Sequence, residues 1–425
     1  MLATASSARY TAPRERIQPA ATDFAPISRL MNDAIAAEKL PGGVVVVGHG
    51  GRIVFHQAYG SRKLAGEDGL DGSPAPAEPM TEDTIFDIAS MTKSLATATA
   101  VMQLHEKGLV AFDEPVQTYL PDFNPDNDPV RQRVTVRMLL THTSGEPIDV
   151  NLDDPWGVDA PDKAEGIRRA LSAPLQSAPG EVYRYADINY ILLGAMLEKL
   201  TGEAEDDYVQ RNIFAPLGMT DTRYLPPAEV RPRIAPTAVD DRGHLLRGTV
   251  HDPTTRRMGG VAGHAGIFST AHDVALYAQA LLDRLANRPS TFPLQQATLA
   301  MMTTPQQPGR RPGQVEAAND AVRKAAATAP NPMDPLLAPH YPAIEGQELF
   351  GFGWDIDTAF SKPRGLVFPV GSFGGTGFTG TSLWLDPGSD TYVVLLTNAI
   401  HVRGSEPISG LRGDVATAAA DGVGL

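Results

Sequence analysis

The chain has 425 residues, of which 42% are hydrophobic and 20% are charged, as is common for a globular protein. The formal net charge of −14 disfavours nucleic acid and anionic membrane surfaces as partners. The absence of cysteine excludes thiol catalysis, disulfides and thiolate metal sites. No stretch approaches the roughly 18 consecutive apolar residues of a membrane span, so we expect none.

Residues 1–23 are predicted to form a disordered N-terminal tail. Their start lacks the charge and the apolar region of a signal peptide. Ala3-Thr4-Ala5 has the small-x-small pattern of a cleavage site, which would indicate a periplasmic or secreted protein after removal of a signal peptide. The alternative is a polar tail on a cytoplasmic protein, and the sequence leaves both open.

The first elements alternate between helical and strand periodicity. Apolar residues at helical spacing predict a helix over 24–38, which the Pro41-Gly42-Gly43 break ends. Residues 44–47 and 53–55 predict a β-hairpin around a glycine-rich turn. A short strand-like segment follows at 84–89.

The middle of the chain is predicted to be mostly helical, and the C-terminus returns to strands. The helical runs are 95–105, 136–140, 191–200 and 274–285. A second hairpin is predicted from residues 381–385 and 392–396, with room for a final helix from about 408. Strands at both ends around a helical middle predict one antiparallel sheet built from both termini, with an all-α region inserted.

This organisation divides the chain into two domains. Residues 24–95 and 350–425 are assigned to the discontinuous α/β domain, and residues 96–349 to the helical one. Within the latter, the Pro/Ala-rich segment 306–342 has few large apolar residues, so we predict a long and partly disordered insertion loop.

Ser90-Met91-Thr92-Lys93 stands at the start of the helical run that follows the 84–89 segment. A lysine three residues after a serine lies on the same helical face, where it can activate the hydroxyl as a nucleophile. Serine hydrolases with lysine in place of the triad histidine use this spacing. Taken alone, the match also fits an N-cap serine beside a solvated lysine.

Tyr185 is a candidate second proton carrier, just before the helical run at 191–200. A neighbouring ammonium favours the phenolate form of a tyrosine. Tyr185 can therefore take the serine proton while the charge of Lys93 stabilises the phenolate, or Lys93 can take the proton with Tyr185 as its partner. Tyr183 and Tyr190 compete for this role, and a packing tyrosine is the simpler interpretation of Tyr185 in isolation.

A glycine-rich stretch at 373–381 runs into the C-terminal hairpin. Glycines at a strand edge permit close approach of a substrate. An amide on this edge, together with the amide of Ser90, would form an oxyanion hole. The alternative is a turn that only lets the sheet bend.

In this order the motifs Ser-x-x-Lys (90–93), Tyr-x-Asp (185–187) and x-Thr-Gly (375–377) resemble those of the serine β-lactamase and penicillin-binding-protein superfamily. The branch that the chain resembles contains the class C β-lactamases, D,D-peptidases and family VIII esterases. Further similar stretches are 139–145, 216–219, 258–271 and 377–384. The resemblance covers roughly residues 24–400, except for the insertion.

Membership implies an α/β sandwich plus an all-α domain, with the site between them. By residue-by-residue match, Ser90 is the acylated nucleophile, Lys93 its general-base partner and Tyr185 the second proton-transfer group. The amides of Ser90 and Phe378 are the candidates for the oxyanion hole.

Two positions depart from the pattern of a β-lactamase. Asp187 replaces the usual asparagine, so it cannot donate an amide to substrate, and its charge raises the pKa of Lys93 and favours Tyr185 as the base. Gly375 replaces the lysine or histidine that helps receive a substrate carboxylate. Arg403 is a possible substitute, although a surface role suits it better. The substrate-binding candidates are Asp187, Gly375, Thr376, Gly377 and His264.

His264, between Gly263 and Ala265, is expected either to line the cleft or to make a structural hydrogen bond. His142 is expected to order its own loop. His251 and Asp252 with His264 match no compact ligand spacing, so we predict no metal, and we expect no cofactor.

The leading hypothesis is a serine hydrolase that forms an acyl-enzyme on Ser90 and hydrolyses esters or amides. Carboxylesterase or D,D-peptidase-like activity is favoured, with weak β-lactamase activity, on a small ester, β-lactam or peptide. The alternatives are a β-lactamase proper and a non-catalytic penicillin-binding or scaffold module. No Gly-x-Ser-x-Gly of an α/β-hydrolase is present. The oligomeric state is left open.

Overall fold

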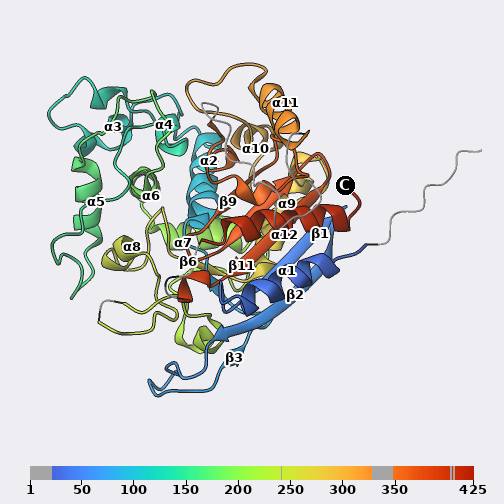
Figure 1. Ribbon diagram of the computed structural model, residues 1–425. Helices are drawn as coiled ribbons and strands as arrows, with labels where there is room; N and C mark the ends of the chain where they lie inside the picture. Colours follow the sequence, from blue (N-terminus) through green and yellow to red (C-terminus); the bar gives the residue numbers. More distant parts are fainter. Residues whose placement is uncertain (1–21, 241, 328–347, 403, 405–406) are drawn as a thin grey trace, which may run out of the picture.

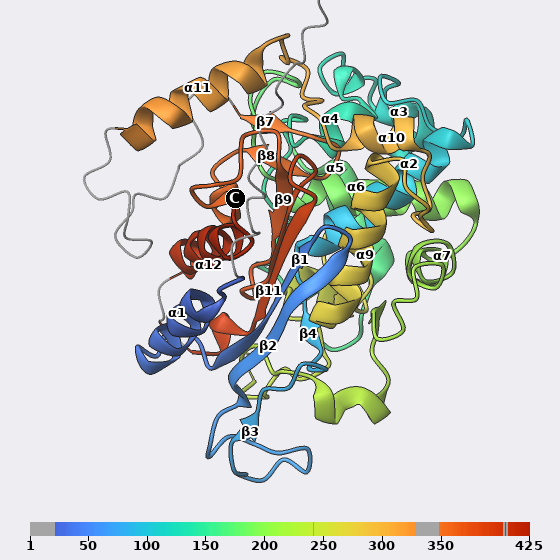
Figure 2. The same ribbon diagram turned by 90° about the vertical axis from the view of Figure 1, so that its right-hand side faces the viewer.

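The computed structural model describes residues 22–240, 242–327, 348–402, 404 and 407–425, and Figures 1 and 2 show it from two sides. Most of the predicted tail, Arg403 and part of the predicted insertion therefore lie outside the described residues. An antiparallel sheet has the strand order β3-β2-β1-β11-β10-β9-β8-β7. Its strands are β1 (Gly42–His49), β2 (Arg52–Lys63), β3 (Glu78–Pro79), β7 (Leu349–Phe350), β8 (Asp355–Asp357), β9 (Phe373–Thr376), β10 (Ser382–Asp386) and β11 (Thr391–Thr397).

Strands from the N-terminal and C-terminal parts of the chain pair at the centre of this sheet. There β1 pairs with β11, and Val46 lies opposite Val394. Val44 and Val46 point into one apolar core and Val45 and Val47 into another, and all four are fully buried. Each such buried side chain contributes roughly 1.5–3 kcal/mol. A continuous apolar run is therefore what a strand covered on both faces requires. The predicted sheet from both termini is confirmed.

Helices cover both faces of the sheet. Helices α1 (Ala25–Ala36) and α12 (Ser409–Gly422) pack side by side on one face, and α9 (Ala271–Leu285) packs on β1 and β11 from the other (Figure 2). The α/β sandwich implied by the resemblance is confirmed. Helix α9 belongs to the range 96–349, which was assigned to the helical domain, yet it packs on the sheet. The predicted domain boundaries at 95/96 and 349/350 therefore stay a prediction.

Most of the remaining helices form one region of the molecule, and α11 (Gln314–Ala327) lies apart from them, above α12 in both views (Figures 1 and 2). A π-helical turn, η1 (Lys93–Ala98), leads into α2 (Thr99–Glu106), and α6 (Asp187–Thr201) packs against both. The others are α3 (Val116–Tyr119), α4 (Val136–Leu140), α5 (Lys163–Ser172), α7 (Glu205–Val209), α8 (Pro253–Arg257) and α10 (Gln296–Met302).

The segment predicted as a strand before Ser90 lies in a separate small sheet. There β4 (Phe86–Asp87) pairs with β6 (Ile267–Ser269), which also pairs with β5 (Arg223–Tyr224). The small sheet thereby fixes the residues that lead into the serine motif.

The predicted insertion loop is wrong for residues 314–327, which form α11. Val315, Ala318 and Val322 lie on one side of this helix and pack against the main core. Asn319 ties the helix to Val370 through hydrogen bonds in both directions. The sequence contains this three-residue apolar stripe at helical spacing. The helix was not predicted because small and charged residues dominate the segment around the stripe.

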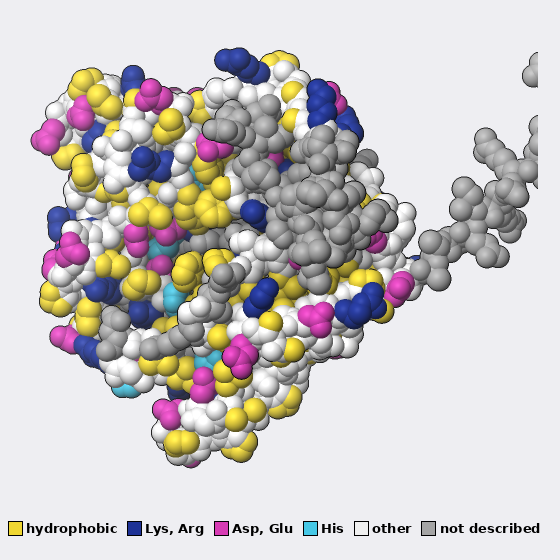
Figure 3. All heavy atoms as spheres, viewed as in Figure 1, with side chains coloured by type: hydrophobic (Ala, Val, Ile, Leu, Met, Phe, Trp, Pro, Cys, Tyr) yellow, Lys and Arg dark blue, Asp and Glu magenta, His cyan; other side chains and the backbone are white. Residues whose placement is uncertain are grey.

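The surface agrees with the acidic composition. On the face drawn in Figure 3, the Lys and Arg side chains of the coloured residues lie among Asp and Glu and form no broad basic patch. Among the described residues, no helix has the length and apolar character needed to cross a membrane.

Candidate active site

Ser90 is presented by a strained turn between β4 and the helix that contains Lys93. The residue before it, Ala89, has a φ of 46°, in the left-handed region that side chains other than glycine rarely adopt. The Ala89 amide donates to the Asp87 carboxylate at 2.9 Å, which holds this turn. Lys93 lies one helical turn after Ser90, at the start of the π-helical segment.

The structure brings Ser90, Lys93 and Tyr185 together. Nζ of Lys93 donates to Oγ of Ser90 at 2.9 Å, and Oη of Tyr185 donates to the same oxygen at 2.8 Å. The Lys93 ammonium lies 4.9 Å from the centre of the Tyr185 ring. Two proton carriers therefore converge on one hydroxyl, as nucleophilic catalysis by serine requires.

The remaining partners of Lys93 keep it charged. Nζ also bonds to Oδ1 of Asp187 at 2.6 Å and donates to the main-chain oxygen of His264 at 3.0 Å. Burial by itself lowers the pKa of Lys93, but Asp187 and Tyr185 outweigh it and leave the pKa above its ordinary value. Burial raises the pKa of Tyr185 to about 12, against the charge of Lys93. The resting state at neutral pH is therefore an ammonium beside a phenol.

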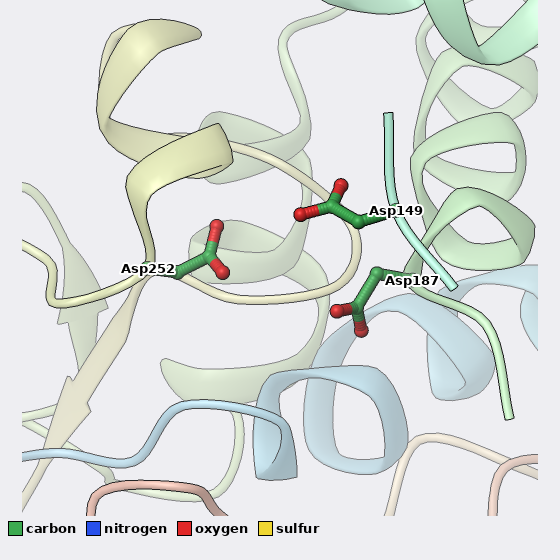
Figure 4. A group of neighbouring side chains, drawn as sticks. All are labelled: Asp149, Asp187 and Asp252. Atoms are coloured by element: carbon green, nitrogen blue, oxygen red, sulfur yellow. The ribbon is translucent and has the colours of Figure 1, made fainter. Parts of the chain in front are cut away.

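Asp187 belongs to a group of three carboxylates drawn in Figure 4. Oxygens of Asp149, Asp187 and Asp252 lie within 4.8 Å of one another. Burial, together with the two neighbouring carboxylates, raises the pKa of Asp149 to about 6. Carboxylate oxygens are ligands that hard cations accept, yet Lys93 already pairs with Asp187 and His264 with Asp252 at 2.9 Å. We assign no metal to this group. No local motif marks Asp149, which joins the group only through the fold.

His264 is buried, with a side chain that is only 1% exposed. Its Nε2 bonds to Asp252 and to the Thr255 hydroxyl, and its ring is not among the residues that line the cavity beside Ser90. Its contact with the candidate site is through its main-chain oxygen, which accepts from Lys93.

The glycine-rich edge lies along the same cavity, which Gly375, Thr376 and Gly377 line. A Cβ at Gly377 would lie 2.4 Å from the main-chain oxygen of Ile88, so only glycine fits there. A Cβ at Gly375 would meet only the Ser94 hydroxyl, at 3.4 Å, so this position has room for a side chain. The glycine-rich edge therefore packs closely against the segment that leads into Ser90.

The two amides expected to form the oxyanion hole border this cavity. Within the described ranges, the backbone N–H groups of Ser90 and Phe378 donate to no protein acceptor. Two backbone N–H groups that border the cavity beside the nucleophile and have no protein acceptor can donate to an oxyanion.

The cavity has a volume of about 400 Å³ and a largely apolar wall. Two aromatic side chains at its edge are partly in solvent. Phe360 packs on Tyr185 with ring centres 5.1 Å apart, and Phe378, 72% exposed, stacks on His251 at 5.4 Å. This shape suits a small substrate with an apolar portion.

Two ionisable side chains in the cavity wall were missed in the sequence analysis. Arg412 on α12 donates to the main-chain oxygens of Gly377 and Thr381, at 2.7 and 3.0 Å, and bonds to no carboxylate of the described residues. Burial lowers its pKa to about 10, so it remains charged. Asp355 on β8 accepts from Thr358 at 2.6 Å, and burial raises its pKa to about 7. No local motif marks either residue, because the packing of distant elements brings them to the cavity.

The fold places the chain among the serine hydrolases with the β-lactamase architecture. The family described as Beta-lactamase matches residues 27–408, and the chain belongs to this family. The predicted superfamily is therefore confirmed.

Known proteins are similar to the chain in sequence or in fold. A protein of Escherichia coli (strain K12) named "Putative D-alanyl-D-alanine carboxypeptidase" is 28% identical over 381 residues, 84% of this chain and 78% of that protein. The LovD9 variant of simvastatin synthase from Aspergillus terreus has a TM-score of 0.64 at 24% identity, covering 93% of this chain and 98% of that one. EstCE1, a hydrolase with promiscuous acyltransferase activity, has a TM-score of 0.64 at 21% identity, with the same coverage.

Proposed function

We propose that Ser90 forms an acyl-enzyme with small ester or amide substrates, with Tyr185 as the proton carrier and Lys93 as its electrostatic partner. The observation that carries this proposal is the convergence of Lys93 Nζ and Tyr185 Oη on the Ser90 hydroxyl, at 2.9 and 2.8 Å. A packing tyrosine and a solvated lysine would have no reason to share one serine oxygen.

Acylation begins once the Tyr185 phenol has lost its proton to solvent, which leaves a phenolate beside the Lys93 ammonium. The Ser90 oxygen bonds to the substrate carbonyl carbon while its proton passes to the Tyr185 oxygen. The oxyanion that forms lies against the amides of Ser90 and Phe378. When the bond to the leaving group breaks, Tyr185 returns the proton to that group and becomes a phenolate again.

Deacylation reverses these roles with water. Tyr185 accepts a proton from the attacking water as its oxygen bonds to the acyl carbon. The bond to Ser90 then breaks, and Tyr185 returns the proton to the serine oxygen. The acid product leaves, and every group is restored for the next cycle.

Arg412 favours substrates with a carboxylate near the scissile bond. The sequence lacks a cation at Gly375, and this absence by itself favours a neutral ester. Arg412, a cation in the same wall and bonded to the carbonyl of Gly377, offers a replacement from α12. A D,D-carboxypeptidase acting on peptides that end in D-Ala-D-Ala is therefore the second candidate, and the name of the Escherichia coli relative agrees with it.

One set of measurements separates these activities. The protein and its Ser90→Ala variant are given an activated ester, a chromogenic cephalosporin and a D-Ala-D-Ala peptide, and intact mass is followed alongside turnover. Ester or peptide turnover with a transient acyl adduct, both lost in Ser90→Ala, supports the proposal. A stable adduct without turnover supports a penicillin-binding module instead. Turnover that survives Ser90→Ala contradicts the proposal.

A further inference from the structure

His142 contacts the chain on both sides of Tyr185. Its main-chain oxygen accepts a hydrogen bond from the Arg184 amide at 2.7 Å, and its ring Nδ1 accepts one from the Ala186 amide at 3.2 Å. Its imidazole also lies against the Tyr185 phenol, with ring centres 4.5 Å apart and planes inclined by 30°. One residue therefore holds the backbone before Tyr185, the backbone after it and the ring between them.

The imidazole of His142 is neutral and carries its proton on Nε2. A backbone amide can only donate, so the contact with Ala186 requires a lone pair on Nδ1. The Asn189 amide nitrogen lies 3.2 Å from the same Nδ1, and Ser144 donates to the Asn189 oxygen at 2.5 Å, which fixes that amide as a donor. Burial, with the charge of Lys93, holds the pKa of His142 well below its ordinary value.

Simple packing does not explain a histidine at this position. His142 has a φ of 56°, and its side chain is 1% exposed. Its ring contacts with Tyr190 and Phe350, both at 5.2 Å, need only a flat ring, which phenylalanine supplies. The two hydrogen bonds at Nδ1 need an acceptor that phenylalanine lacks.

We infer that His142 is a positioning residue that keeps the Tyr185 phenol within proton-transfer distance of Ser90, an inference that rests on the proposed role of Tyr185. Tyr185 lies in irregular chain just before α6, so no ladder of backbone bonds fixes it. Its oxygen is 2.8 Å from the Ser90 oxygen. A displacement of about 1 Å would take the pair out of proton-transfer range and cost roughly a hundredfold in rate.

Two variants of His142 distinguish a role in positioning Tyr185 from a role in packing alone. His142→Phe keeps the ring and loses the acceptor. His142→Asn places an acceptor oxygen near the position of Nδ1 and tolerates a positive φ, but it loses the ring. We expect His142→Phe to lower kcat by about 10- to 100-fold with KM within about threefold, and to shift the pH profile of kcat. We expect His142→Asn to recover part of this loss.

Asn189→Asp tests the same acceptor at Nδ1 without replacing His142, and it serves if His142→Phe does not fold. The new carboxylate would face Nδ1, favour a proton there and so remove the acceptor for the Ala186 amide. We expect a similar fall in kcat and a new titration in the pH profile. The matched control is His105→Phe, because His105 packs on Phe112 at 4.1 Å outside the cavity lining, and it should leave both readouts unchanged.

The inference is overturned if a folded His142→Phe or Asn189→Asp protein keeps the wild-type kcat and pH profile. It is also overturned if the losses in His142→Phe and His142→Asn are equal and follow their losses in melting temperature. A wild-type protein inactive with every ester, cephalosporin and peptide probe would instead contradict the proposed function itself.

Discussion

Nζ of Lys93 lies 2.6 Å from Oδ1 of Asp187, so the lysine beside the candidate nucleophile is held as one half of an ion pair. Asp187 raises the pKa of Lys93 against the effect of its burial, and it adds to the effect of burial on the pKa of Tyr185. An asparagine, the usual residue of the family at this position, would keep the length of the side chain and remove the charge. Asp187 therefore helps to set the pH at which the base forms.

Asp187→Asn should move the rising limb of the pH profile of kcat/KM to lower pH by about 1 unit. The sign follows from the charge: without the nearby anion, both Lys93 and Tyr185 lose a proton more easily, so both pKa values fall. Activity at pH 7 should rise, as measured with an activated ester between pH 6 and 10. A limb that stays in place, or moves to higher pH, would show that Asp187 does not control the base.

Tyr185→Phe should lower kcat by about 10²- to 10⁴-fold, because the proton of Ser90 then has no phenol oxygen to receive it. Tyr183→Phe is the matched control, since Tyr183 is also half-buried nearby and has no hydrogen bond to Ser90 in the part of the chain that the structure describes. The rate of adduct formation by intact mass is the measurement. Equal effects of the two substitutions would remove Tyr185 from the mechanism.

Arg412→Met should lower the preference for a peptide with a free C-terminal carboxylate over its C-terminal amide by about tenfold or more. The ratio of the two kcat/KM values within one variant cancels any general damage from the lost bonds to Gly377 and Thr381. Gly375→Lys in the same protein should restore the preference, because that position has room for a side chain. An unchanged ratio would mean that Arg412 serves only the fold.

Glu146→Gln should stabilise the protein at pH 9 much more than at pH 5. Burial raises the pKa of Glu146 to about 8, partly opposed by Arg131. A raised pKa gives stability that is complete below the unfolded value, near 4.3, and is lost as the pH rises through 8. At pH 9 the variant should therefore gain at least about 1 kcal/mol, because it buries no charge.

Thermal unfolding at the two pH values checks this, with the exposed Glu229→Gln as the control. The same change in melting temperature at pH 5 and pH 9 would show that ionisation of Glu146 does not limit stability.

The regular elements near the two termini could be predicted because their patterns are strong and local. The run Val44–Val47 is apolar throughout because β1 is covered on both faces, and the hairpins carry their own turn residues. Helix α11 was missed because its stripe of Val315, Ala318 and Val322 is short and its partner surface is distant in sequence. The segment before Ser90 has strand character, but nothing local could say that it pairs with β6.

The sequence by itself determined the family and the candidates Ser90, Lys93 and Tyr185, because spacing on a helix and an ordered set of motifs are local properties of the chain. The tertiary structure decided what surrounds them. The family resemblance already implied that Asp187 lies beside Lys93, whereas Arg412 reaches the cavity only because α12 packs on the sheet. His142 contacts the backbone beside Tyr185 through the Ala186 amide, which lies 44 positions further along the chain. Charge, burial and alignment depend on neighbours in space, so no pattern along the chain could supply them.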